Sequence, residues 1–256
     1  MRANRLRELW NAGKPVINGW CSMPGAFSAE LMASMGWDAV TVDTQHGVIG
    51  YSEMLAMLQA ISTTAATPLV RVSWNQPGEI MRALDAGAYG VICPMINDAA
   101  ECAAFVQACR YPPEGFRSSG PTRAVVYGGA DYHAKANGEM LAFAMIETAA
   151  GLANVEAIVA TPGLDGVYIG PSDLSLAMGG PPGQDSDAPA LMAAFDKILA
   201  ACKAAGVRVG VHTNSPAYSQ KMIGRGFDLV TVGADTRYLM SGRREAAEMR
   251  AWLDAH

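Results

Sequence analysis

The feature that most constrains this chain is a pattern that recurs along most of its length. A helical segment ends at glycine, a few residues follow, and a short strand rich in Val and Ile begins, as in "AGAYGVICP", "TPGLDGVYIG" and "AAGVRVGVH". Glycine suits the left-handed residue that closes a helix, and continuous apolar runs are typical of parallel strands buried on both faces. The pattern therefore predicts a series of βα units.

Eight strands can be counted in this way. They are expected at residues 16–20, 39–42, 69–72, 90–93, 141–146, 166–169, 207–211 and 229–232. Eight strands with helices between them favour a (β/α)8 barrel, the TIM-barrel fold, over an open sheet. A chain of 256 residues with 50% hydrophobic content can bury one large core, so we expect residues 1–256 to form a single domain. Two irregular segments, 111–139 and 179–187, are predicted to be active-site loops.

Composition argues against several classes of function. The formal net charge is -5 and Lys and Arg cluster only in "RANRLR" at the start, so we expect no nucleic-acid partner. No apolar stretch approaches the ~18 residues of a membrane span, and the first residues lack the apolar run of a signal peptide. Five cysteines without a C-x-x-C pair fit a reducing compartment. We therefore expect a soluble, cytoplasmic protein.

Polar and titratable side chains stand where several of the predicted strands end. They are Asp43 and His46 after "VTV", Arg71 after "PLV", Glu147 after "FAMI", Asp173 after "VYIGPS" and His212 after "VRVGV". In an eight-stranded barrel the carboxyl ends of the strands meet at one rim, and this rim carries the active site. One such residue alone is usually a helix cap or a loop contact, whereas several from different strands predict an active site.

Glu147 and Asp173 are the best candidates for metal ligands. Two carboxylates from adjacent strand ends can supply oxygen ligands and leave the other positions of an octahedral ion to water and substrate, as is common for Mg²⁺ and Mn²⁺. Zinc is not favoured, because neither Cys nor His stands beside them at ligand spacing. The alternative remains open that Asp173 caps a helix and Glu147 is a first-turn charge.

Arg71 emerges from a buried strand, where an unpaired guanidinium would be costly unless it faced an anion. It can stabilise a developing oxyanion, or it can form a structural ion pair across the barrel mouth. His46 can act as a general acid or base, with Asp43 or Asp85 to orient it, although a loop histidine can also be inert. All five lysines lie outside the predicted barrel interior, which excludes a Schiff-base aldolase.

Five motifs in order along nearly the whole chain resemble the HpcH/HpaI aldolases. They are "WDAVTVDTQHG", "PLVRVSWNQP", "LDAGAYGVICPMI", "AMIETAAGLANVEAI" and "LDGVYIGPSDLSLAMG". Members of that family are metal-dependent class II pyruvate aldolases. The resemblance implies reversible cleavage of a 4-hydroxy-2-oxo acid to an aldehyde and pyruvate or hydroxypyruvate, with Mg²⁺, Mn²⁺ or Co²⁺ as the cofactor.

The resemblance also implies roles for individual residues. His46 matches the catalytic histidine, Asp85 matches the carboxylate that raises its basicity, and Arg71 matches the group that stabilises the enolate. Glu147 and Asp173 match the ligands of the divalent metal ion.

Substrate contacts are expected from a second group of residues. By the same resemblance, Gly170 and Ser172 match the backbone that receives the pyruvate carboxylate. Met145 stands where many members carry Gln, which leaves the contacts of that amide with the substrate open. The position of His212 at a strand end predicts a further contact. Arg123, in the segment 111–139, is expected on the aldehyde side, unless that segment is only a surface excursion.

Two alternatives to the aldolase remain open. An enzyme of the phosphoenolpyruvate-mutase or citrate-lyase type shares the barrel and the metal chemistry, and a strong phosphate site would favour it. The segment "TVGADTRYL" after the eighth strand lies where barrels often bind phosphate, but it has only one glycine. The other alternative is a metal-dependent 2-oxo acid binding protein without turnover.

The C-terminal segment "SGRREAAEMRAWLDAH" predicts an amphipathic helix. Ala246, Met249, Trp252 and Leu253 fall on one face at helical spacing, and such a stripe must be covered. The barrel of the same chain can cover it, as is usual for an eighth helix. The resemblance implies instead that the helix is exchanged between subunits, in a homohexamer built as a trimer of dimers.

Overall fold

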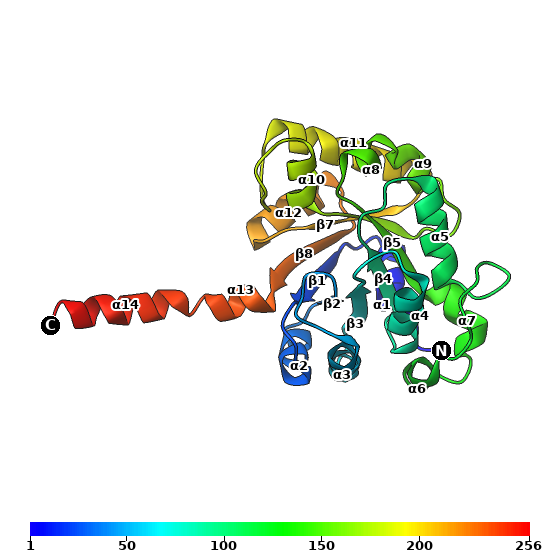
Figure 1. Cartoon of the computed structure of the whole chain (residues 1–256), viewed down its shortest axis with the longest axis horizontal. Coiled ribbons are helices and arrows are strands. Elements are labelled where there is room, and N and C mark those ends of the chain that lie inside the picture. Colours follow the sequence, from blue (N-terminus) through cyan, green and yellow to red (C-terminus); the bar gives the residue numbers. More distant parts are fainter.

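The computed structural model, which describes residues 1–256, has eight parallel strands that close into a barrel (Figure 1). The strands are β1 (Val16–Cys21), β2 (Ala39–Asp43), β3 (Thr67–Arg71), β4 (Gly90–Cys93), β5 (Leu141–Ile146), β6 (Gly166–Ile169), β7 (Arg208–His212) and β8 (Leu229–Ala234). Each strand pairs with the next in the sequence, and β8 pairs with β1. The predicted TIM barrel is confirmed, and all eight predicted strands are present.

Helices precede the first strand, occupy the connections between strands and follow the last strand. They are α1 (Arg5–Asn11), α2 (Ala26–Ser34), α3 (Tyr51–Ile61), α4 (Pro77–Asp85), α5 (Ala99–Cys109), α6 (Thr122–Gly128), α7 (Tyr132–Glu139), α8 (Ala149–Ala153), α9 (Val155–Val159), α10 (Pro171–Ala177), α11 (Pro189–Ala205), α12 (Pro216–Arg225), α13 (Asp235–Met240) and α14 (Arg243–Asp254). A bilayer-crossing helix would have to be longer and more apolar than any of these.

The sequence pattern that predicted the barrel has a direct structural cause. Gly206 and Gly226 end α11 and α12 in the left-handed conformation, with φ of 69° and 102°, immediately before β7 and β8. Every residue of β2 to β6 is buried, because helices cover the outside of the barrel and side chains fill its interior. The interior side chains include Phe143 and Tyr168, both fully buried.

The segment 111–139 lies at the end of the barrel opposite to the predicted one. It follows α5 and precedes β5, so it joins the end of a helix to the start of a strand. Such connections lie at the N-terminal rim of a barrel, away from the catalytic rim. The segment folds into α6 and α7, and its residue Glu139 accepts hydrogen bonds from Asn4. The prediction that it is an active-site loop of the same chain is therefore wrong.

The C-terminal helix α14 projects away from the barrel together with α13 (Figure 1). None of its residues is buried, and Met249, Trp252 and Leu253 are all more than half exposed. The predicted amphipathic helix is present, but the barrel of the same chain does not cover its apolar face. The outer face of α2 is also apolar and exposed, at Phe27 and Leu31.

Candidate active site

A cavity of about 270 Å³ opens at the carboxyl ends of the strands. Its walls are Trp20, Ser22, Asp43, His46, Arg71, Met145, Gly170, Pro171, Ser172, Asp173, Gln184, His212, Ala234 and Thr236. Most of the predicted site residues are in this set, although they come from five different strands or their following loops. The predicted loop at 179–187 also reaches the cavity, through Gln184.

Arg71 and Asp43 form a two-pronged ion pair at the cavity wall. The Nε and Nη2 atoms of Arg71 donate to the two carboxylate oxygens of Asp43 at 2.9 and 2.6 Å. Burial alone would raise the pKa of Asp43, but the hydrogen bonds and charge of Arg71 outweigh it, so this pKa is lowered. Arg71 is only 8% exposed. Its remaining Nη1 contacts only the sulfur of Met145, at 4.0 Å, and is free to meet a bound anion.

Asp43 also shapes the loop that carries His46. Its Oδ1 accepts hydrogen bonds from the main-chain N–H groups of Gln45 and His46, at 3.1 and 3.3 Å. Asp43 therefore holds the backbone of His46 and the guanidinium of Arg71, but not the imidazole, contrary to the prediction. The imidazole of His46 lines the cavity and has no hydrogen-bond partner within the chain.

Asp85 and Arg123 lie outside this cavity. Asp85 is the last residue of α4, a helix that starts at the catalytic rim and runs back to the opposite end of the barrel. It forms an ion pair with Arg117 at 2.7 Å. Arg123 donates to the carbonyl oxygens of Ala86 and Leu58 at the same end. Within one chain, Asp85 cannot orient His46 and Arg123 cannot contact substrate in this cavity.

Glu147 lies behind the cavity wall, with only 2% of its surface exposed. Its Oε1 accepts the main-chain N–H of Met95 at 2.8 Å, and its Oε2 packs beneath Gly170, where an added Cβ would come within 2.6 Å of that oxygen. Burial raises the pKa of Glu147 to about 7, and the nearby charge of Asp173 adds to this effect.

Asp173 stands in the first turn of α10 but does not cap it. The N-cap is Gly170, and no side chain bonds to the N-terminal amides of this helix. The interpretation of Asp173 as a helix cap is therefore wrong. Gly170 and Ser172, the residues predicted to receive a carboxylate, form the start of the same helix at the cavity wall.

The two carboxylates suit a hard divalent cation. Asp173 is close enough for its charge to raise the pKa of Glu147, and no side chain or main-chain group of the protein forms a hydrogen bond with the Asp173 carboxylate. No third His, Cys, Asp or Glu joins them in a ligand cluster. Two oxygen donors with room for water and substrate match the way in which Mg²⁺ or Mn²⁺ is usually held.

Two contacts of the Trp20 indole, with Arg71 and with His212, were not predicted from the sequence. Trp20 is buried at the end of β1, its Nε1 donates to Asp43 at 3.3 Å, and the guanidinium of Arg71 lies 4.9 Å from its ring centre. The ring of His212 packs edge-on against the same indole at 4.8 Å. The only sequence signal for Trp20 was its place at the end of a strand, and an apolar residue there is typical of core packing.

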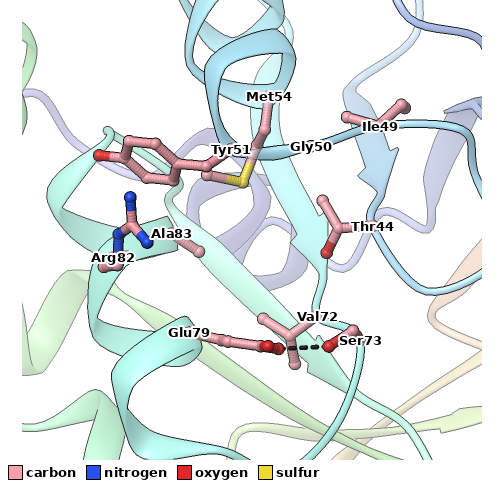
Figure 2. Close-up of a pocket in the computed structure, with 10 residues that line it drawn as sticks. All are labelled: Thr44, Ile49, Gly50, Tyr51, Met54, Val72, Ser73, Glu79, Arg82 and Ala83. Carbon is pink, nitrogen blue, oxygen red and sulfur yellow. Dashed lines mark hydrogen bonds between the residues drawn. The ribbon is translucent and has the colours of Figure 1, made fainter.

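A second hollow, of about 230 Å³, lies between α3 and α4 (Figure 2). Figure 2 shows Glu79 bonded to Ser73, while the guanidinium of Arg82 stacks 3.7 Å from the ring centre of Tyr51. This hollow has no pair of carboxylates and no histidine. The chemically equipped site is therefore the cavity at the strand ends.

Several known proteins are similar to this chain over most of its length. A family model described as HpcH/HpaI aldolase/citrate lyase matches residues 20–241. A hydroxypyruvate/pyruvate aldolase of Rhizorhabdus wittichii is 40% identical, covering 97% of this chain and 99% of its own. A 4-hydroxy-2-oxo-heptane-1,7-dioate aldolase of Salmonella arizonae is 36% identical, covering 95% and 93%. The crystal structure of an HpcH/HpaI aldolase/citrate lyase family protein from Burkholderia cenocepacia has a TM-score of 0.87 at 31% identity, covering 96% and 98%.

Proposed function

The chain belongs to the HpcH/HpaI aldolase/citrate lyase family, and we propose that it is a class II pyruvate aldolase. It reversibly cleaves 4-hydroxy-2-oxo acids to an aldehyde and pyruvate or hydroxypyruvate. The observation that carries this proposal is a cavity lined by a desolvated, pre-aligned guanidinium and by Asp173, with the carboxylate of Glu147 packed behind Gly170 of the same wall. The five cysteines form no disulfide bonds, which supports a cytoplasmic location for the enzyme.

Glu147 and Asp173 are the proposed ligands of a divalent ion, Mg²⁺, Mn²⁺ or Co²⁺. When bound, the ion supplies a Lewis acid for the 2-keto group of the substrate. The buried Glu147 gives up its proton to become a ligand, which the positive charge of Arg71 favours. The start of α10, at Gly170 and Ser172, is the proposed seat of the substrate carboxylate.

Arg71 supplies fixed positive charge for the enolate that forms as the C3–C4 bond breaks. Because Asp43 holds two of its nitrogens, the guanidinium is aligned before the substrate arrives, and a buried charge of this kind acts with little screening. His46 is the proposed acceptor of the 4-hydroxyl proton. The bonding electrons pass to the three-carbon unit, and the departing carbon becomes the aldehyde.

The proposed pairing of Asp85 with His46 requires a second copy of the chain. Asp85 lies at the end of the barrel opposite to His46, so only a neighbouring subunit can bring the two together. The uncovered face of α14 supports such an assembly. We propose that α14 is exchanged between subunits in a hexamer, a trimer of dimers.

A phosphate-transfer enzyme is less well supported. At the end of β8, where barrels often bind phosphate, the chain places Asp235, which is 5% exposed. This carboxylate accepts the main-chain N–H groups of Ser22 and Met23 at 3.0 Å. A buried negative charge that already uses the local N–H donors would repel a phosphate group.

The test is a screen of metal-reconstituted protein against 4-hydroxy-2-oxo acids of different chain length and charge, with release of pyruvate or hydroxypyruvate as the readout. We expect release that stops when a chelator removes the metal. Arg71→Ala should abolish it, whereas Arg82→Ala, which removes a guanidinium outside the cavity, should not. Release of neither product from any substrate, or full activity without metal, would refute the proposal.

A further inference from the structure

A column of polar side chains runs through the barrel interior beneath the cavity. Asn18, Thr41, Tyr168 and Thr231 all have 0% exposure. The Oγ1 of Thr231 lies 2.8 Å from one end of the Asn18 amide and 2.6 Å from the hydroxyl of Tyr168. The Tyr168 hydroxyl in turn lies 3.0 Å from Nδ1 of His212. The column therefore links the barrel core to a residue of the cavity wall.

Asn18 sets the direction of this hydrogen-bonded column. One end of its amide faces the main-chain oxygens of Ala39 and Gly19, both at 3.1 Å. Carbonyl oxygens only accept hydrogen bonds, so this end must be the NH2 group. The other end is then the amide oxygen, and it accepts from the hydroxyl groups of Thr41 and Thr231 at 3.0 and 2.8 Å.

The direction passes from Asn18 to His212, because each hydroxyl has one hydrogen. The hydrogen of Thr231 goes to Asn18, so the 2.6 Å contact between Thr231 and Tyr168 must use the hydrogen of Tyr168. Tyr168 then has only lone pairs left for His212. The 3.0 Å contact therefore needs a hydrogen on Nδ1 of His212, which fixes the ring as the Nδ1–H tautomer.

The other ring nitrogen, Nε2, is then a lone-pair acceptor. It has no hydrogen-bond partner in the protein, and the ring lines the cavity, so Nε2 is the atom that can meet a bound molecule. Burial, with the positive charge of Arg71, lowers the pKa of His212 to about 3. The ring is therefore neutral at ordinary pH and too weak a base to remove a proton from substrate, but it can accept a hydrogen bond.

The two three-carbon acids differ in what they can offer to a hydrogen-bond acceptor. Pyruvate has no hydrogen-bond donor, because its three oxygens only accept and its methyl group is apolar. Hydroxypyruvate differs by one hydroxyl group on C3, which can donate. His212 and Arg71 both contact the indole of Trp20 and line the same cavity, and the charge of Arg71 acts on the His212 ring. The ring therefore lies near the guanidinium assigned to the enolate of this three-carbon unit.

We propose that Nε2 of His212 accepts a hydrogen bond from the C3 hydroxyl of the three-carbon unit, and that the protein therefore favours hydroxypyruvate over pyruvate. The inference rests on the proposed aldolase function and names its donor substrate. His212 determines specificity, while Thr231 and Tyr168 are positioning residues that keep Nε2 free of hydrogen.

The tautomer can be read directly from ¹⁵N NMR of the Mg²⁺-loaded full-length protein, which has four histidines. We expect His212 to show the Nδ1–H pattern, unchanged between pH 5 and 8. In Thr231→Val, Tyr168 loses its acceptor and can donate to Nδ1, so the tautomer should reverse to Nε2–H. An Nε2–H tautomer in the parent protein would overturn the inference whatever the enzyme does.

Specificity is measured in the direction of aldol addition, with one aldehyde as the common acceptor. It is the kcat/KM for hydroxypyruvate divided by the kcat/KM for pyruvate. His212→Leu and Thr231→Val should each lower this ratio about tenfold, because each loses one hydrogen bond of ~1.4 kcal/mol. His212→Gln keeps an acceptor and should preserve most of the preference for hydroxypyruvate. An unchanged ratio in His212→Leu would overturn the inference. If the protein shows no turnover, the preference can still be measured as the ratio of the Kd values of the two acids, determined by calorimetry on the Mg²⁺-loaded protein. A failure of the aldolase proposal can therefore be told apart from a failure of the inference on His212.

Discussion

Glu147 is expected to destabilise the metal-free protein at neutral and alkaline pH. Its pKa rises from an ordinary value of 4.5 to about 7 on folding, because burial and the charge of Asp173 oppose ionisation. Between pH 4.5 and 7 the folded chain holds a proton that the unfolded chain has lost. The free energy of unfolding therefore falls by about 3 kcal/mol as pH rises through this interval. It stays at the lower value at higher pH.

The variant Glu147→Gln tests this linkage. Its amide oxygen can still accept the N–H of Met95, but it carries no charge. For chelator-treated protein at one fixed concentration, we expect the variant to be more stable than the parent by up to about 3 kcal/mol at pH 8 and nearly equal at pH 4.5. Denaturant titrations across this pH range measure the difference. Saturating Mg²⁺ should reverse the order, because the ion binds the folded parent.

A matched control is Glu156→Gln, which removes an exposed carboxylate on α9. Its effect on the free energy of unfolding should be small and should not grow between pH 4.5 and 8. The reasoning on Glu147 would be refuted by a variant no more stable than the parent at pH 8, or by a gain in stability that is the same at both ends of the range.

Further variants separate the roles of the other site residues. Arg71→Ala should lower the rate of solvent exchange of the pyruvate methyl protons, followed by NMR, on the order of 10²-fold or more. His46→Ala should keep this exchange but lower the rate of aldol cleavage by a similar factor. Near-normal cleavage by either variant contradicts its assignment. Asp43→Asn leaves Arg71 buried without its counter-charge, so denaturant titration should show a loss of about 3 kcal/mol or more; a smaller loss would mean that the pair is not what holds the guanidinium. Truncation after Gly242 should lower the number of subunits seen by light scattering, and an unchanged number would show that α14 does not join them.

The barrel and most of the site could be predicted from the sequence because both depend on local signals. A Val- and Ile-rich run after a glycine marks a buried strand, and the polar residue that follows it marks the catalytic rim. Asp43, Arg71 and Glu147 were found by this rule; the first two line one cavity, and Glu147 packs against Gly170 of its wall. The rule works because parallel strands all end at the same rim.

Two predicted site residues that the same chain does not bring to the cavity are ones to which this rule does not apply. Asp85 ends the helix α4, and Arg123 lies in the connection from the helix α5 to the strand β5, and both positions are at the opposite end of the barrel. The sequence already contained that signal, since the segment 111–139 precedes a predicted strand. The contact of Asn18 with Thr231 could not be predicted, because 213 positions separate them and only barrel closure brings them together.

The bare helix α14 has a consequence for how an assembly would form. A helix of twelve residues is only marginally stable by itself in water, and most helices in proteins owe their stability to packing. The apolar residues of α14 find no packing on their own barrel, so a second chain would have to supply it. Ordering of this helix and docking of the second chain would then be one coupled transition. On dilution, the helical circular dichroism signal should therefore decrease over the same range of protein concentration in which the subunits dissociate.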